Sequence, residues 1–105
     1  DAYVDWLGLD GYNWGTSQSW SSWQSFAEVF GASYGTITSI AAKPMMITET
    51  ASSEHGGDKA AWIVAAFAQS IPRQFPLIRA VVWFDANKET DWRVSSSDTA
   101  LDAYR

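Results

Sequence analysis

Three short apolar runs, each ending in an acidic residue, constrain the fold of this chain more than any other feature. The clearest is Pro44-Met45-Met46-Ile47-Thr48-Glu49-Thr50. Apolar runs bounded by a proline are typical of buried parallel strands, which we predict over 4–10, 45–49 and 78–84. In α/β proteins the carboxyl ends of such strands carry the chemistry. With aromatic residues beside them, the three acids are expected to form one wall of a carbohydrate-cleaving site.

Helical stripes separate the three runs. Apolar residues recur at helical spacing over 23–30, with Ser22 as the expected N-cap. Gly31 is expected to interrupt this helix, because glycine weakens helices, and a second helical stretch follows over 34–41. The region between the first two strands is therefore predicted to be helical but broken.

Two further helices are predicted in the second half of the chain. Asp58 is a good N-cap for a helix over about 59–71, which Pro72 is expected to end. Either Ser96 or Ser97 is expected to cap the last helix. The resulting alternation of strand and helix implies a parallel sheet with right-handed crossovers.

A sheet of only three parallel strands leaves one face uncovered. Both faces of each strand are apolar, and helices cover just one of them. In a closed (β/α)₈ TIM barrel the other face packs against the opposite strands. This chain has 105 residues, whereas such barrels have roughly 250. We therefore expect an α/β fold made of three units of a TIM barrel, completed by the remainder of the barrel or by a second copy of the chain. The abrupt start at Asp1, directly before a strand, agrees with an excerpt.

Composition excludes several kinds of partner and site. The net charge is −5 and there is no basic patch, so neither nucleic acid nor an anionic membrane surface is an expected partner. The absence of cysteine excludes disulfides and thiolate chemistry within the chain. His55 is the single histidine, which excludes a multi-histidine metal site. No cofactor or metal ion is expected.

Glu49 is the centre of a candidate catalytic constellation. Retaining glycoside hydrolases use two carboxyl groups about 5–5.5 Å apart, one of which attacks the anomeric carbon. Glu49 fits this nucleophile, and Tyr12, on the loop just past the first strand, could orient it and keep it ionised. Trp83 could stack against a sugar ring, and Trp14 and Trp92 could extend the binding cleft.

These residues also have structural interpretations. Glu49 could instead cap the loop or helix that follows its strand. Asp10 precedes a glycine and is expected to fix a turn, and Asp85 is expected to hold the following loop by accepting backbone N–H bonds. His55 lies in a polar loop and is expected to be a solvated residue there.

The motifs together resemble the C-terminal part of glycoside hydrolase family 26, whose members are chiefly endo-β-1,4-mannanases. They are Val4-Asp5-Trp6-Leu7-Gly8-Leu9-Asp10-Gly11-Tyr12-Asn13-Trp14, Lys43-Pro44-Met45-Met46-Ile47-Thr48-Glu49-Thr50, Gly56-Gly57-Asp58-Lys59, and Ala80-Val81-Val82-Trp83-Phe84-Asp85, followed by Asp91-Trp92-Arg93-Val94-Ser95-Ser96. The resemblance runs nearly from end to end and in the expected order. It implies that residues 1–105 are the C-terminal part of a catalytic barrel, with its sixth, seventh and eighth strands.

The resemblance also implies roles for individual residues. Glu49 matches the catalytic nucleophile, Tyr12 the tyrosine that hydrogen-bonds it, and Trp83 the platform at the cleavage subsite. The acid/base glutamate of the family, at the end of the fourth strand, has no counterpart here. General acid catalysis contributes about 10²–10⁴-fold, so the chain alone should be nearly inactive. The resemblance implies that the whole protein is a secreted, retaining endo-glycosidase that hydrolyses a β-1,4-linked plant polysaccharide, with β-mannan as the favoured substrate.

Alternatives within and outside the family stay open. Lichenase-type β-glucanases and xylanases share the fold and mechanism, and the residues that separate them lie partly on strands outside this chain. A non-catalytic carbohydrate-binding module would fit the tryptophan content, but such modules are usually β-sandwiches without helical stripes. A scaffold built from a partial barrel is a third possibility.

Overall fold

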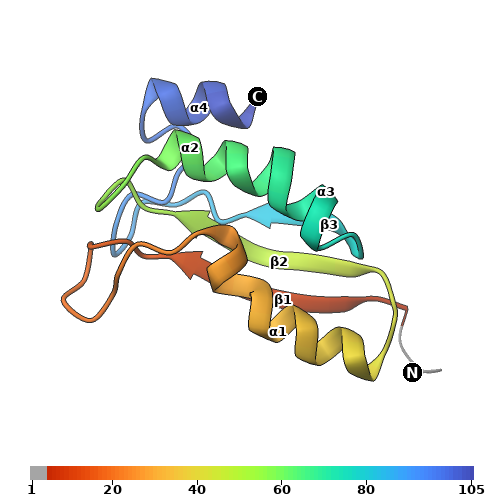
Figure 1. Ribbon diagram of the computed structural model, residues 1–105. Coiled ribbons are helices and arrows are strands. Elements are labelled where there is room, and N and C mark those ends of the chain that lie inside the picture. Colours follow the sequence, from red (N-terminus) through yellow and green to blue (C-terminus); the bar gives the residue numbers. More distant parts are fainter. Residues whose placement is uncertain (1–4) are drawn as a thin grey trace.

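One parallel sheet forms the centre of the structure, a computed structural model that describes residues 5–105. Its strands are β1 (Leu7–Asn13), β2 (Met45–Ser52) and β3 (Ile78–Trp83), in the spatial order β1-β2-β3 (Figure 1). Both strand pairs are parallel, which confirms the predicted sheet. The first strand was expected to begin at Val4, which lies outside the described residues.

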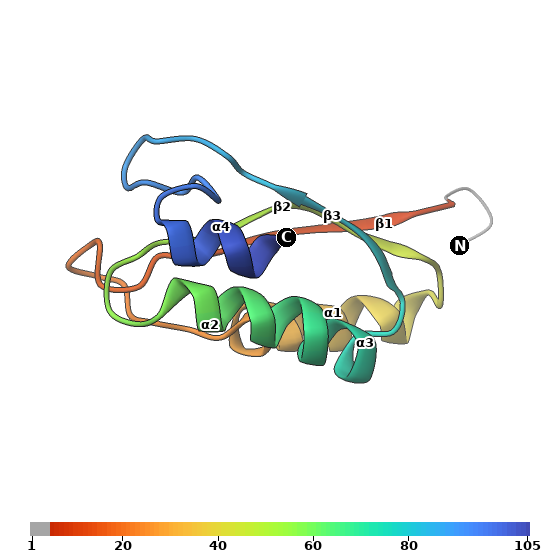
Figure 2. The same cartoon turned by 90° about the horizontal axis from the view of Figure 1, so that it is seen from above.

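All helices lie on one side of this sheet (Figure 2). They are α1 (Phe26–Ile40), α2 (Lys59–Val64), the π-helix η1 (Ala65–Ser70), α3 (Ile71–Gln74) and α4 (Asp98–Tyr104). Within residues 5–105 no helix or strand covers the opposite face of the sheet, and the loop between β3 and α4 rises on that side at one end. We call this uncovered side the open face.

The N-terminus of α1 differs from the prediction. Its N-cap is Ser25 and not Ser22, because Ser25 forms a capping box with Glu28. The Ser25 hydroxyl accepts a hydrogen bond from the Glu28 amide at 3.1 Å, and the Glu28 carboxylate accepts one from the Ser25 amide at 3.0 Å. This reciprocal pair satisfies two backbone donors at once, which a serine at position 22 would not do.

The predicted break at Gly31 is wrong, because α1 continues through it to Ile40. A glycine costs a helix only about 1 kcal/mol. Phe26 and Phe30, which are 2% and 1% exposed, anchor the same helix in the core. Burial of two phenylalanine side chains outweighs that cost.

Pro72 does not end its helix, which continues to Gln74. A proline clashes with the carbonyl four residues earlier and donates no hydrogen bond. The six residues before Ile71 form a π-helix, in which the wider turn changes the spacing of the carbonyl groups. Phe75 closes the segment with backbone bonds to both Ser70 and Ile71, each 3.2 Å. The predicted caps of the other helices, Asp58 and Ser97, are confirmed.

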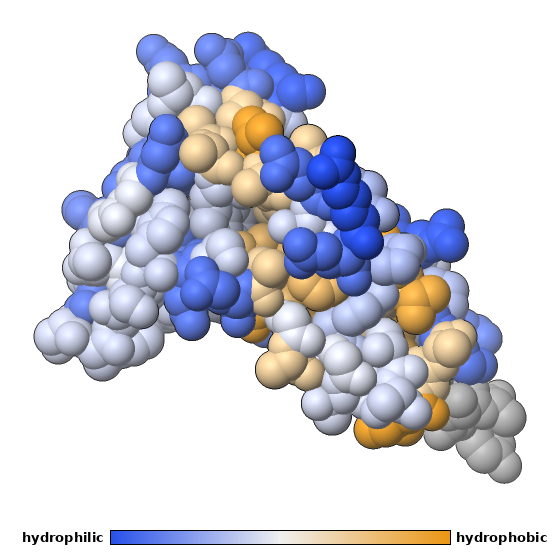
Figure 3. All heavy atoms as spheres, viewed as in Figure 1, coloured by the Kyte–Doolittle hydropathy of each residue, from blue (hydrophilic) through white to orange (hydrophobic). Residues whose placement is uncertain are grey.

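The hydrophobic core lies between the sheet and the helices. Its fully or nearly buried members are Phe26, Phe30, Met45, Ile47, Trp62, Ile63, Ala66, Phe75, Ile78 and Ala100. Figure 3 shows the helix side, where apolar side chains remain visible among polar ones. The packing holds β2 as the central strand and so fixes the backbone that carries Glu49.

An extra residue in β2 decides where Glu49 points. Leu9 pairs with Ile47, but Asp10 pairs with Glu49, so Thr48 is left over as a bulge. Side chains alternate between the two faces of a strand, and a bulge shifts that alternation by one. Ile47 is buried against the helices, and Glu49 lies on the open face beside Asp10. The strand was expected to end at Glu49, but it continues for three residues because it pairs with the extended β1.

Candidate active site

Glu49 and Tyr12 meet on the open face of the sheet. The Tyr12 hydroxyl donates a hydrogen bond to Oε1 of Glu49, as the sequence predicted. Tyr12 lies within β1 rather than on the loop after it, because β1 continues to Asn13 through its pairing with β2. Both partners are therefore held by paired backbone, which gives the contact a fixed geometry.

The surroundings of Tyr12 keep its hydroxyl protonated. Burial, the hydrogen bond to Glu49 and the charge of Glu49 raise the pKa of Tyr12 far above its ordinary value of 10.0. The charges of Asp10 and Glu89 act in the same direction. Each effect disfavours a phenolate next to a carboxylate. The hydroxyl thus remains a hydrogen-bond donor in neutral and mildly alkaline solution.

Because of this pKa, Tyr12 should make the protein less stable above pH 10. In the unfolded chain Tyr12 loses its proton near its ordinary pKa of 10.0, whereas in the folded protein it keeps it. The folded state then binds more protons, so the free energy of unfolding falls as the pH rises. In urea titrations between about pH 10 and 11, Tyr12→Phe should show a shallower fall than the wild type. Tyr104→Phe is the matched control for loss of a phenol, and equal slopes for wild type and Tyr12→Phe would contradict the prediction.

A cavity of about 310 Å³ opens beside the Glu49–Tyr12 pair. Two predicted residues, Trp14 and Trp92, line it together with the pair. Its remaining lining residues, which sequence reasoning missed, are Phe84, Lys88 and Glu89. All three follow β3 directly, so their place after a parallel strand was the signal that could have found them.

The two predicted cavity tryptophans differ in exposure. Trp92 is 1% exposed, and its ring centroid lies 5.2 Å from that of Tyr12 and 4.8 Å from that of Trp14. Its Nε1 donates to Oε1 of Glu89 at 3.4 Å. Trp14 is half-buried and meets the exposed Trp20 edge to face at 5.0 Å. Trp92 therefore supports the site as a buried packing residue, and Trp14 offers a ring that is more accessible to solvent.

Trp83 does not line the cavity that the other predicted site residues share. It pairs with Thr50 in the sheet and turns toward the helices. Its ring lies edge to face with Trp62 at 6.1 Å and with Tyr104 at 5.6 Å. Its Nε1 donates to the Trp92 carbonyl at 2.8 Å. This position gives no support to a sugar platform at Trp83, because Phe84 is the residue of this segment that faces the cavity.

The structural interpretations of three other residues have mixed outcomes. Asp85 accepts a hydrogen bond from the Val94 amide at 2.7 Å, which confirms that it holds its loop. His55 is exposed in a loop, as predicted. Asp10 lies in β1 and accepts a bond from Thr48, so its predicted role in a turn is wrong. The extended β1 keeps this residue in the sheet.

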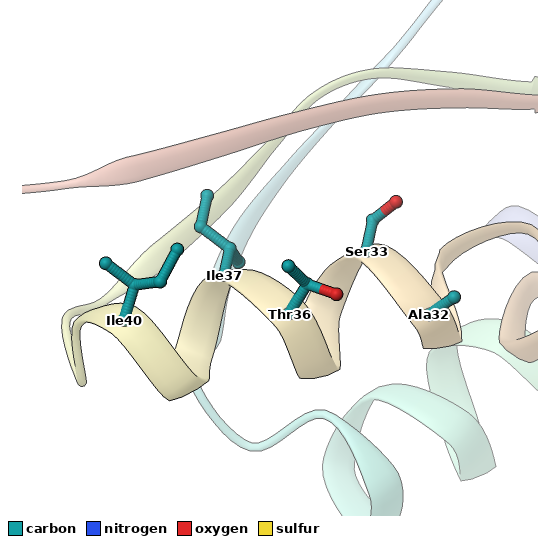
Figure 4. A pocket seen from close by; sticks show the side chains of 5 residues that line it. All are labelled: Ala32, Ser33, Thr36, Ile37 and Ile40. Atoms are coloured by element: carbon teal, nitrogen blue, oxygen red, sulfur yellow. The ribbon is translucent and has the colours of Figure 1, made fainter.

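Residues 5–105 contain no group of three or more histidine, aspartate or glutamate side chains that could hold a metal ion. None of the helices formed by these residues is long and apolar enough to cross a membrane. A second cavity of about 380 Å³ lies along α1 (Figure 4). It has no titratable side chain, and its lining residues are Ala32, Ser33, Thr36, Ile37 and Ile40.

The fold and the first cavity define an α/β unit that presents a tyrosine-bonded carboxylate among aromatic side chains. No protein-family model matches the chain. Among curated proteins, the chain is 55% identical over 106 residues to Endoglucanase H of Acetivibrio thermocellus. The match covers 100% of this chain and 12% of that protein. The chain therefore spans about one eighth of the length of this relative.

Proposed function

We propose that this chain is part of the catalytic domain of a retaining endo-glycosidase, with Glu49 as its nucleophile. The observation that carries the proposal is the Glu49 carboxylate, hydrogen-bonded to Tyr12 and facing a cavity with aromatic walls. The similarity to a protein named as an endoglucanase supports the same class of reaction.

The geometry suits covalent catalysis by a carboxylate. Tyr12 bonds Oε1 of Glu49, and within residues 5–105 no hydrogen bond is made to Oε2. That oxygen is free to attack the anomeric carbon, and the glycosidic bond breaks as the leaving oxygen takes a proton from the acid/base. Water, giving a proton back to the same acid/base, would then hydrolyse the glycosyl ester with retention of configuration and release the Glu49 carboxylate. Tyr12 holds the carboxylate in one orientation, which is the condition for a near-attack geometry.

Glu89 is the second carboxylate in the cavity, but it is unsuited to be the general acid. A hydrogen bond from its own backbone, with another from Trp92, holds the pKa of Glu89 below its usual range despite an opposing effect of desolvation. A lowered pKa is the opposite of what a general acid needs, because that role requires the carboxyl group to keep its proton near the working pH. The acid/base would come from a part of the protein outside this chain.

The uncovered side of the sheet supports a place within a larger barrel. Glu49 and its cavity lie on the open face, where the strands of a closed barrel would converge. We propose that this chain contributes three units to a TIM barrel of the family 26 type, and that the remainder of the barrel covers this face. The small share of the relative that the chain spans agrees with such an excerpt.

The substrate we propose is a β-linked polysaccharide. The aromatic lining suits the apolar C–H faces of sugar rings. The family resemblance favours β-mannan, whereas the name of the relative favours a β-glucan. Initial rates of the full-length protein on galactomannan, lichenan, carboxymethylcellulose and xylan would show whether it prefers β-mannan or a β-glucan.

Covalent trapping tests the proposed nucleophile directly. The full-length protein is incubated with 2-deoxy-2-fluoro β-cellobioside and β-mannobioside carrying a good leaving group, and the labelled peptide is sequenced by mass spectrometry. We expect the label on Glu49, because the fluorine slows hydrolysis of the glycosyl ester. A label on another carboxylate, or hydrolysis with inverted product configuration, would contradict the proposal.

A further inference from the structure

Lys59 is a buried cation close to the site, and the proposed mechanism does not use it. It is the first residue of α2, and its side chain is 1% exposed. Its Nζ donates to the Arg93 carbonyl at 2.7 Å, to the Ser96 hydroxyl at 2.8 Å and to the Trp92 carbonyl at 3.3 Å. With a fourth, longer bond to the Asp91 carbonyl at 3.5 Å, one ammonium group thus holds four points of the loop 84–97, which connects β3 and α4.

Neutral dipoles rather than an ion pair satisfy this ammonium. No carboxylate within residues 5–105 forms an ion pair with Lys59. Glu54 reaches it through Ser96, whose hydroxyl lies 2.6 Å from the Glu54 carboxylate. Burial lowers the pKa of Lys59, as expected for an ammonium group away from water. A buried cation costs several kcal/mol of desolvation unless its bonds are well placed.

The loop that Lys59 holds is the one that walls the cavity. It carries Lys88, Glu89 and Trp92, and it folds back on itself through a bond from the Trp92 amide to the Ala86 carbonyl at 2.9 Å. The Trp92 carbonyl accepts from both Lys59 and Trp83, so the backbone of Trp92 is fixed from two sides.

A continuous set of contacts leads from Lys59 to the proposed nucleophile. The fixed Trp92 backbone places its indole against the Tyr12 ring at 5.2 Å. Tyr12 in turn donates its hydroxyl to Glu49. We infer that Lys59 is a positioning residue for the proposed reaction: by holding the Trp92 backbone, it fixes the Tyr12 ring and thereby the orientation of the Glu49 carboxylate. This inference rests on the function proposed above.

The test is Lys59→Met in the full-length protein, because methionine nearly matches the shape of lysine and has no donors. We expect kcat to fall roughly 10- to 100-fold with KM changed less than about threefold, since a misplaced catalytic group costs rate. The rate of labelling of Glu49 by the 2-fluoro glycoside should fall in parallel. Near-ultraviolet circular dichroism should change as Trp92 and Tyr12 lose their fixed contact.

Val64→Ala is the matched control, because it truncates an exposed side chain of α2, 45% accessible, and removes no donor to the loop. Assayed well below its melting temperature, this variant should keep the wild-type kcat. Lys59→Gln, which keeps amide donors on a shorter side chain, is measured in the same way and should show a smaller fall in kcat. A folded Lys59→Met with wild-type kcat and labelling rate would overturn the inference, as would failure of both Lys59 variants to fold, which would make Lys59 a determinant of stability alone.

Failure of the inference and failure of the proposed function give different results. If the wild-type protein is never labelled at Glu49, the proposed function fails. If the wild type is labelled and the Lys59 variants are labelled at the same rate, only the role of Lys59 fails.

Discussion

Glu49→Ala in the full-length protein should lower kcat by roughly 10⁴-fold or more, since the covalent route needs the carboxylate that attacks. KM should change little, because the aromatic walls of the cavity remain in place. Initial rates on the preferred polysaccharide, with reducing ends as the readout, measure both constants. Activity within about tenfold of the wild type would remove Glu49 from the mechanism.

Two further measurements test whether the loss of activity is specific to the Glu49 carboxylate. Sodium azide should restore part of the activity of Glu49→Ala, because a small anion can occupy the space of the lost carboxylate, and the product should then be a glycosyl azide of inverted configuration. Asp102→Asn is the matched control, since Asp102 is an exposed carboxylate on α4, 77% accessible and 4.0 Å from Arg105. It should leave kcat unchanged.

Trp92→Ala should lower the free energy of unfolding by about 3–5 kcal/mol. The indole is 1% exposed and packs against Tyr12 and Trp14, so its removal leaves a large void next to the cavity. Urea unfolding of the full-length protein, followed by tryptophan fluorescence, measures the loss. Activity at temperatures where the variant is folded should also fall, because Tyr12 loses the ring that supports it.

Trp20→Ala provides the comparison for Trp92→Ala. Trp20 is 69% exposed and touches Trp14 at its edge, so we expect a loss of about 1 kcal/mol or less. Equal losses for the two variants would mean that Trp92 is not a core residue of this site.

The sequence was sufficient for the elements and their order, and insufficient for their ends. Apolar runs and helical stripes identified the three strands and the helices between them. Ser25 displaced Ser22 as a cap because a glutamate stands three residues after Ser25. The helix that contains Pro72 continues because a π-helix accommodates the ring, and no local pattern announces a π-helix. In each case an interaction between particular side chains or turns decided the boundary.

The site was predicted in part, because sequence position does not determine which face of a strand a residue occupies. The hydrogen bond between Tyr12 and Glu49 was predicted, although Tyr12 was expected on the loop after the first strand and lies within β1. Trp83 turns toward the helices and Phe84 toward the cavity, which follows from the irregular register between β2 and β3. The position of Lys59 could not be predicted, because no local sequence pattern indicates that its ammonium group is buried under a distant loop.

The leftover Thr48 makes the pairing of Asp10 with Glu49, more than the length of the strand, the property that this stretch of β2 must preserve. Exchanging one apolar residue for another before Glu49 would alter packing by small increments, and the acid would still point outward. Deletion of Thr48 would put Glu49 directly after Ile47 and leave it opposite Asp10, so the carboxylate would still face outward from a regular strand. Homologous chains should therefore occur with and without the leftover residue, and in both forms the acid should stay opposite the aspartate of the first strand.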